Sequence, residues 1–284
     1  MKTILLVLSV FTCLIQCLSI DENAFPYIFP NVPPVKDLVN SGFEEDAVLD
    51  FIALTKKYGY TSEEHEVITE DGYILTIFRI SRGKACNRSE PPDPVVMMHG
   101  LLKSSDTFVT PGVGLAYTLA DSCYDVWCAN VRGNRYSREH VKWDPDKDKE
   151  FWQFSFHEHG TIDLATTVDY VLNETKAEKN IKGDFFRRYD AGANKNLENY
   201  GQEEPLDYDL AKVTAPVVLI CSNDDAIATP KDVERLRDEL PNVIDMFTLR
   251  DPHWGHLDFT DGNDIPLELA PKVLEYLRVA RDGR

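Results

Sequence analysis

The sequence predicts an α/β fold with a mostly parallel sheet flanked by helices. Apolar runs such as PVVMMHG and APVVLICSNDD are continuous rather than alternating, which is typical of strands buried on both faces of a parallel sheet. Segments with helical spacing separate these runs along the chain. Strands that alternate with helices in this way favour a doubly wound sheet.

Residues 1–19 are predicted to be a signal peptide. Lys2 precedes an apolar run from Ile4 to Ile15, and small residues follow it, so we expect cleavage after Ser19. The run is too short to span a bilayer, and no later run is longer. We therefore expect residues 20–284 to form one exported α/β domain without an integral membrane segment.

The remaining elements are expected in a regular order. A helix at residues 45–60 precedes a hairpin at 65–80, where two β-prone runs surround Asp71-Gly72. Leu164, Val168 and Val171 stand at helical spacing and predict an amphipathic helix at 161–175. The other predicted strands are 94–100, 124–133, 215–225 and 243–251, and the other predicted helices are 112–122, 231–242 and 269–280.

The chain is acidic, with 48 Asp and Glu against 30 Lys and Arg and a net charge of −18. Loss of Lys2 with the predicted signal peptide would make the charge one unit more negative. Such a surface repels phosphate groups, so neither nucleic acid nor an anionic lipid headgroup is an expected partner.

Four cysteines follow the predicted signal peptide, namely Cys86, Cys123, Cys128 and Cys221. Four cysteines allow three sets of two disulfides, and the sequence does not choose among them. Cys128 and Cys221 lie in apolar strand-like runs, where buried free thiols are common. Asn87 and Asn173 each begin an Asn-x-Ser/Thr sequon, so both are predicted glycosylation sites of an exported protein.

Neither a metal nor a cofactor is predicted. The sequence has no CxxC pair, and His253 with His256 has no third ligand nearby. His157, Glu158 and His159 resemble a ligand cluster, but a packing role at the start of a helix is favoured for them.

Three groups of polar residues follow predicted strands, where the working residues of such sheets lie. They are His99-Gly100, Asn223-Asp224-Asp225 and His256. A carboxylate that precedes a histidine along the chain is typical of the last two members of a Ser–Asp–His triad in α/β-hydrolases. In such a triad the acid orients the imidazole, which activates the serine hydroxyl.

Six ordered blocks of the sequence carry a resemblance to a known family. They are HGLLKSSDTFV, LAYTLADSCYDVWCANVRGNRYSREH, FWQFSFHEHGTIDLATTVDY, NLENYGQEEPLDYDLAKVTAPV, ATPKDVERLRDELPNV and DPHWGHLDF. Together they resemble the acid lipase family of α/β-hydrolases, which includes gastric and lysosomal acid lipases and insect gut lipases, and the resemblance runs from about residue 30 to residue 278. It implies an α/β-hydrolase fold, a secreted or lysosomal protein, and hydrolysis of lipid esters of the triglyceride or steryl ester class through an acyl-enzyme.

The resemblance assigns roles to individual residues. His256 matches the catalytic histidine of the family, and Asp225 matches its catalytic acid, with Asp224 as the alternative one position earlier. Leu101 matches the residue whose backbone N–H lines the oxyanion hole.

The nucleophile of the family is missing. The chain has no GxSxG motif, and it has no serine between Ser155 and Ser222. The family's elbow strand, its serine, the next strand and the lid-bearing cap would lie between residues 180 and 181, a loss on the order of a hundred residues from an α/β domain. We expect no replacement from Ser104, Ser105, Thr161, Cys221 or Ser222, because none is placed on a strained elbow aimed at the histidine.

This loss removes two central strands, so the halves of the sheet are expected either to pair directly or to form a poorly stable molecule. Three hypotheses follow, in this order. The sequence is an active lipase with an exon missed, a short isoform that binds lipid or a partner without turnover, or a spliced product that does not fold.

Overall fold

The computed structural model describes residues 8–9, 45–89, 92–100, 103–110, 114–176, 193–203, 208–250 and 253–282. The helices among them are α3 (Phe51–Lys57), α4 (Leu115–Asp121), α5 (Phe156–Glu158), α6 (Ala165–Thr175), α7 (Ala193–Tyr200), α8 (Pro230–Glu239), α9 (Asp258–Asp261) and α10 (Ala270–Asp282). Short 3-10 or π-helical turns are η1 (Glu45–Ala47), η2 (Ser105–Phe108), η3 (Lys149–Trp152), η4 (His159–Leu164), η5 (Leu210–Lys212) and η6 (Ile265–Leu269). Within this part of the chain, no helix combines the length and the apolar character that crossing a membrane requires.

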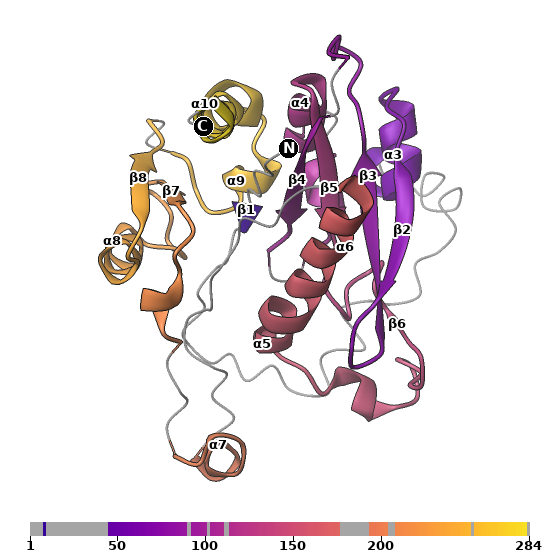
Figure 1. Cartoon of the computed structure of the whole chain (residues 1–284), viewed down its shortest axis with the longest axis vertical. Coiled ribbons are helices and arrows are strands. Elements are labelled where there is room, and N and C mark those ends of the chain that lie inside the picture. Colours follow the sequence, from indigo (N-terminus) through magenta and orange to yellow (C-terminus); the bar gives the residue numbers. More distant parts are fainter. Residues whose placement is uncertain are drawn as a thin grey trace.

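The main sheet has the strand order β1-β4-β5-β3-β2, and β6 pairs with β3 beside this path (Figure 1). Its strands are β1 (Leu8–Ser9), β2 (Glu63–Ile68), β3 (Tyr73–Ile80), β4 (Asp93–Met98), β5 (Tyr124–Ala129) and β6 (Glu139–His140). β4 and β5 are parallel, as expected. β3 is antiparallel to both β2 and β5, so the sheet is mixed rather than mostly parallel.

The antiparallel part of the sheet has a local cause. The predicted hairpin forms at Asp71-Gly72, where Gly72 adopts a φ of 98°, a conformation that favours glycine. This turn returns β3 against β2, and β3 then borders the parallel pair through β5. The hairpin was predicted from the sequence, but the antiparallel pairing of its second strand, β3, with β5 was not.

Both faces of β4 and β5 are buried, as their continuous apolar runs predict. Val95 and Met97 of β4 belong to a core cluster that contains α4 and α10 side chains such as Leu119 and Val273. The alternate residues of these strands contact the other face, where α6 contributes Val168 and Val171. Helices therefore cover the sheet on two sides, with α6 on the opposite face from α4 (Figure 1).

A second, separate sheet contains β7 (Val217–Cys221) and β8 (Val243–Thr248), which are parallel and connected through α8. No ladder joins this pair to the main sheet in the described residues, so direct pairing of the two halves is wrong for this structure. The contact between them is made by side chains instead. Leu249 and Trp254, which follow β8, lie in the same core cluster as side chains of α4 and α10.

The outer edge of β4 is occupied by β1, in which Leu8 and Ser9 pair in parallel with Met97 and Met98. These two residues lie within the predicted signal peptide, and the prediction of cleavage after Ser19 stays a prediction.

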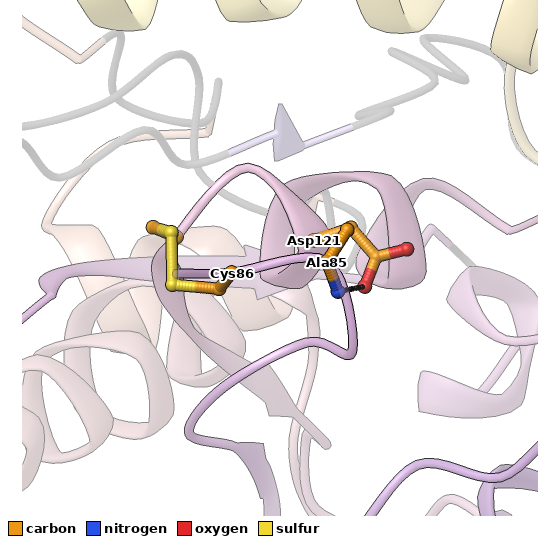
Figure 2. Close-up of a disulfide and its surroundings, with 4 residues drawn as sticks. Ala85, Cys86 and Asp121 are labelled. Carbon is orange, nitrogen blue, oxygen red and sulfur yellow. Dashed lines mark hydrogen bonds between the residues drawn. A yellow bond between two sulfur atoms is a disulfide. The ribbon is translucent and has the colours of Figure 1, made fainter. Parts of the chain in front are cut away.

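One disulfide joins Cys86, in the loop after β3, to Cys123, which lies between α4 and β5 (Figure 2). The same loop is held to this helix by a hydrogen bond of 3.2 Å from the backbone N–H of Ala85 to the carboxylate of Asp121 (Figure 2). Cys128 and Cys221 are buried free cysteines, which confirms the prediction for both.

Candidate active site

Two loops at the carboxyl ends of neighbouring strands form the candidate site. The acid loop, residues 222–229, follows β7, and the histidine loop, residues 253–257, follows β8. Because β7 and β8 are parallel and paired from Val217 to Cys221, their following loops leave the sheet at the same edge.

Asp225 and His256 are in direct contact. The Nδ1 atom of His256 lies 2.9 Å from Oδ2 of Asp225. The other carboxylate oxygen of Asp225, Oδ1, accepts hydrogen bonds from the backbone N–H groups of Ile227 at 2.9 Å and Ala228 at 2.8 Å. Oδ2 is therefore the oxygen that remains for the imidazole, and the carboxylate is fixed from two sides.

The geometry distinguishes between the two candidate acids. Asp225 is buried and bonded to the imidazole, whereas Asp224, the predicted alternative, is exposed. A carboxylate on Nδ1 favours the tautomer that carries its proton there, which leaves the lone pair of Nε2 available. The side chain of His256 is 13% exposed, so its ring is reachable from solvent.

No hydroxyl or thiol among the described residues forms a hydrogen bond to His256. The five residues considered as substitute nucleophiles have other partners. Ser104 bonds to Asp106, Ser105 to Asn130, Thr161 to the carbonyl of His157, Cys221 to Thr248, and Ser222 to the carbonyl of Trp254.

His99 connects the loop after β4 to the loop after β5. Its Nδ1 lies 2.8 Å from the carbonyl oxygen of Gly100, while Nε2 accepts hydrogen bonds from Val131 N–H at 3.3 Å and from the Asn134 amide at 3.1 Å. Burial lowers the pKa of His99 to about 4, so the ring is neutral near pH 7. Leu101, the predicted oxyanion-hole residue, lies outside the described residues.

Glu158 acts at the start of a helix, as predicted. Its carboxylate accepts the backbone N–H of Ser155 at 2.7 Å, and the Ser155 hydroxyl accepts the N–H of His157 at 3.1 Å. This reciprocal capping box begins the helical segment that continues into α6.

Sequence reasoning missed the role of Arg132, which was only included in the predicted strand at 124–133. This side chain is buried, and it binds the carboxylates of both Asp71 and Asp163 while lying 4.0 Å from the ring centroid of Tyr73. It joins the hairpin turn, the end of β5 and the start of α6. The two acidic partners lie 61 and 31 residues away along the chain, so no local pattern signals this contact.

Two family models match the chain. Residues 51–112 match a partial α/β-hydrolase lipase region, and residues 93–181 match the α/β-hydrolase fold. Among solved structures, an esterase of Pyrococcus furiosus is similar with a TM-score of 0.50 and 15% identity over 79% of this chain and 93% of that one. This likeness is one of fold alone.

Curated relatives are lipases. Lipase 1 of Drosophila melanogaster is 28% identical over 378 aligned positions, which cover 88% of this chain and 84% of the fly protein. Gastric triacylglycerol lipase of Mus musculus is 46% identical over 125 residues, or 43% of this chain and 31% of the mouse protein. The tear acid lipase-like protein of Mesocricetus auratus is 36% identical over 199 residues, or 69% of this chain and 47% of that protein.

The lengths of these matches differ in an informative way. The alignment to the fly protein has 378 positions, whereas this chain has 284 residues, so the fly protein carries residues that this chain lacks. Against the mouse and hamster proteins, the chain spans only about a third to a half of the relative.

Proposed function

Because the chain belongs to the acid lipase family of α/β-hydrolases, we propose that Asp225 and His256 are the acid and the base of a lipid-ester hydrolase site. We further propose that this chain lacks the serine that the imidazole would activate. Its relatives act on lipid esters, and the substrate class that this site would take is a triglyceride or a steryl ester. The observation that carries the proposal is the 2.9 Å contact between Nδ1 of His256 and Oδ2 of Asp225.

The roles of the two residues follow from this contact. Asp225 would hold the ring with its proton on Nδ1, so that Nε2 is the atom that removes a proton from an attacking hydroxyl. The imidazolium that results would lie against the Asp225 carboxylate, which stabilises its charge. Leu101 stays the proposed source of one oxyanion-hole N–H, and the second donor would follow the missing serine.

Four observations support a missing internal segment between residues 180 and 181. The chain has no GxSxG motif. The match to the α/β-hydrolase fold ends at residue 181, and the alignment to the fly lipase is longer than this chain. The sheet is also divided at the expected place, because β4 and β7 belong to separate sheets.

The consequence for activity is large. Triad members act as a unit, so the loss of the serine alone removes nearly all of the rate acceleration that the triad supplies. Hydrolysis by this chain through an acyl-enzyme would therefore be negligible. The favoured explanation is an active lipase whose sequence here misses an exon, and sequencing the transcript across Asn180 and Ile181 tests it.

A secreted or lysosomal location is part of the proposal. Disulfides persist in oxidising compartments, so the Cys86–Cys123 bridge agrees with the predicted signal peptide and export. Asn87 and Asn173, the proposed glycosylation sites, are both exposed. A shift in mass after treatment with an N-glycosidase would detect the glycans.

A non-catalytic lipid-binding isoform is the second candidate. Two large apolar side chains beside the couple are exposed, Ile227 by 43% and Leu257 by 59%. Exposed apolar surface at a site suits a lipid ligand. Binding of a fluorescent fatty acyl ester without its hydrolysis, weakened in the I227S/L257S variant, would favour this candidate.

The test of the catalytic proposal is hydrolysis of p-nitrophenyl butyrate by the purified chain and by its H256A variant. We expect both rates to equal the background rate in buffer. A rate for the unmodified chain that is a hundredfold above that of H256A would contradict the proposed loss of the nucleophile.

A further inference from the structure

Ser222 is the last residue before the acid loop turns, and its hydroxyl contacts both loops of the candidate site. Its Oγ donates a hydrogen bond to the carbonyl oxygen of Trp254, which lies two residues before His256. The same Oγ accepts a hydrogen bond of 3.1 Å from the backbone N–H of Asp224, one residue before Asp225. A single hydroxyl therefore links the backbone on both sides of the Asp225–His256 contact.

The surroundings of this hydroxyl make the link rigid. Ser222 is completely buried, and Trp254 is 2% exposed, within the core cluster that contains α4 and α10. The backbone just before Ser222 is also held on the side of strand β8, because the N–H of Leu249 donates a hydrogen bond of 2.8 Å to the carbonyl of Cys221. The Trp254 partner of Ser222 cannot shift without disturbing packed side chains.

The histidine loop has few other anchors near the ring. Gly255 N–H donates to the carboxylate of Asp258 at 2.7 Å, and His256 itself contacts Asp225. Asp225 is fixed within its own loop by Ile227 and Ala228. In the part of the chain that the structure describes, the bond from the Ser222 hydroxyl to the Trp254 carbonyl thus links the histidine loop to the backbone of the acid loop.

We infer that Ser222 is a positioning residue that sets the distance between the two loops and so holds His256 in the Nδ1–H tautomer against Asp225. This inference rests on the proposed function of the couple. Without the hydroxyl, the Trp254 carbonyl and the Asp224 N–H lose a shared partner, and the histidine loop is free to move away from the carboxylate. The imidazole then returns toward the Nε2–H tautomer that a free neutral ring prefers.

The test reads the tautomer directly. The full chain, labelled with ¹⁵N in its seven histidines, is studied by long-range ¹⁵N–¹H correlation at a pH where His256 is neutral, and H256A identifies the signals of that ring. We expect the unmodified chain to show the Nδ1–H tautomer and S222A to show a mixture with Nε2–H. Unchanged ring-nitrogen shifts in S222A would overturn the inference.

Ser137 offers a matched control. It is also completely buried, and its hydroxyl likewise accepts one backbone N–H, from Thr76 at 2.9 Å, and donates to one carbonyl, that of Asn130, at 3.3 Å. S137A should lose stability as S222A does without altering the His256 signals. An equal tautomer change in S137A would show that general loosening of the fold, not the Ser222 link, is responsible, and would also overturn the inference.

Two further variants separate the possible failures. If S222A does not fold, S222T, which keeps a hydroxyl, is compared with S222V, which has the same shape without it, and only S222V should change the tautomer. D225N tests the couple itself. If D225N changes the tautomer and S222A does not, the positioning role is wrong; if neither does, the proposed acid–base couple is wrong.

Discussion

Arg132 donates both its backbone N–H and its Nε–H to the carboxylate of Asp163, at 2.9 and 2.8 Å, and both side chains are buried. Asp163 belongs to the helical turn η4, whereas Arg132 follows β5. The pair therefore fixes the start of α6 to the carboxyl end of the sheet. The second carboxylate that binds Arg132 is that of Asp71, whose side chain is 36% exposed at the hairpin turn.

Replacement of Asp163 by Asn should strongly destabilise the protein. D163N removes the fully buried carboxylate from Arg132 and leaves its guanidinium only the half-exposed Asp71. Loss of one partner from a buried pair costs about 3–5 kcal/mol. D71N removes a carboxylate from the same guanidinium at a site open to water, where an ion pair contributes only about 1 kcal/mol or less. Urea unfolding of both variants tests this order, and equal losses would contradict the structural role assigned to Asp163.

His99 should make the fold sensitive to acid. Burial lowers its pKa to about 4, against about 6.5 for an exposed imidazole, so near pH 5 the unfolded chain binds a proton that the folded chain does not. The contribution of the neutral His99 ring to the free energy of unfolding is complete above about pH 6.5. It is lost as the pH falls from there toward 4. The glutamine of H99Q cannot take up a proton. Between pH 7.5 and pH 5, the unfolding free energy of H99Q should therefore fall by about 2 kcal/mol less than that of the unmodified chain.

The control for this experiment is S137A, which also removes a completely buried polar group but no titratable one. It should keep the pH dependence of the unmodified chain. The role of His99 is wrong if the stabilities of H99Q and S137A fall equally between pH 7.5 and pH 5.

The Cys86–Cys123 disulfide closes a loop between residues 37 positions apart in the sequence. Because such a bridge restricts the unfolded chain, the C86A/C123A variant should lose about 2–4 kcal/mol. Thermal unfolding with and without a reductant measures this loss. The reductant should lower the Tm of the unmodified chain and leave that of the variant unchanged; a reductant-sensitive variant would point to a different pairing.

The sequence was sufficient to predict the elements and residues that a short stretch of the chain identifies by itself. The continuous apolar runs predicted β4 and β5, because strands buried on both faces need no polar alternation. β7 and β8 were also predicted as strands, but both are only partly buried in the structure. The loops after two of these strands drew attention to Asp224, Asp225 and His256, because parallel strands bring their carboxyl ends together. The choice of Asp225 over Asp224 came from the resemblance to the acid lipase family. In the structure, His256 and Asp225 are in contact at 2.9 Å.

What the sequence could not predict depends on pairing across distance. β7 and β8 were recognised as strands, but whether they join β4 depends on partners outside the run itself, and in the described chain they form a separate sheet. The same reason explains why neither the disulfide partner of Cys86 nor the two carboxylates that bind Arg132 could be predicted. Each is set by which loops the fold brings together, and no spacing in the sequence encodes it.

The most direct test of an acid–base couple without its nucleophile is covalent trapping. A fluorophosphonate probe attaches to an activated serine hydroxyl and adds the mass of one phosphonyl group. After incubation of the purified chain with excess probe, intact-mass spectrometry should find the unmodified mass alone. A stoichiometric adduct that disappears in both the H256A and the D225N variants would contradict the account, because it would show that a hydroxyl in this chain does serve His256.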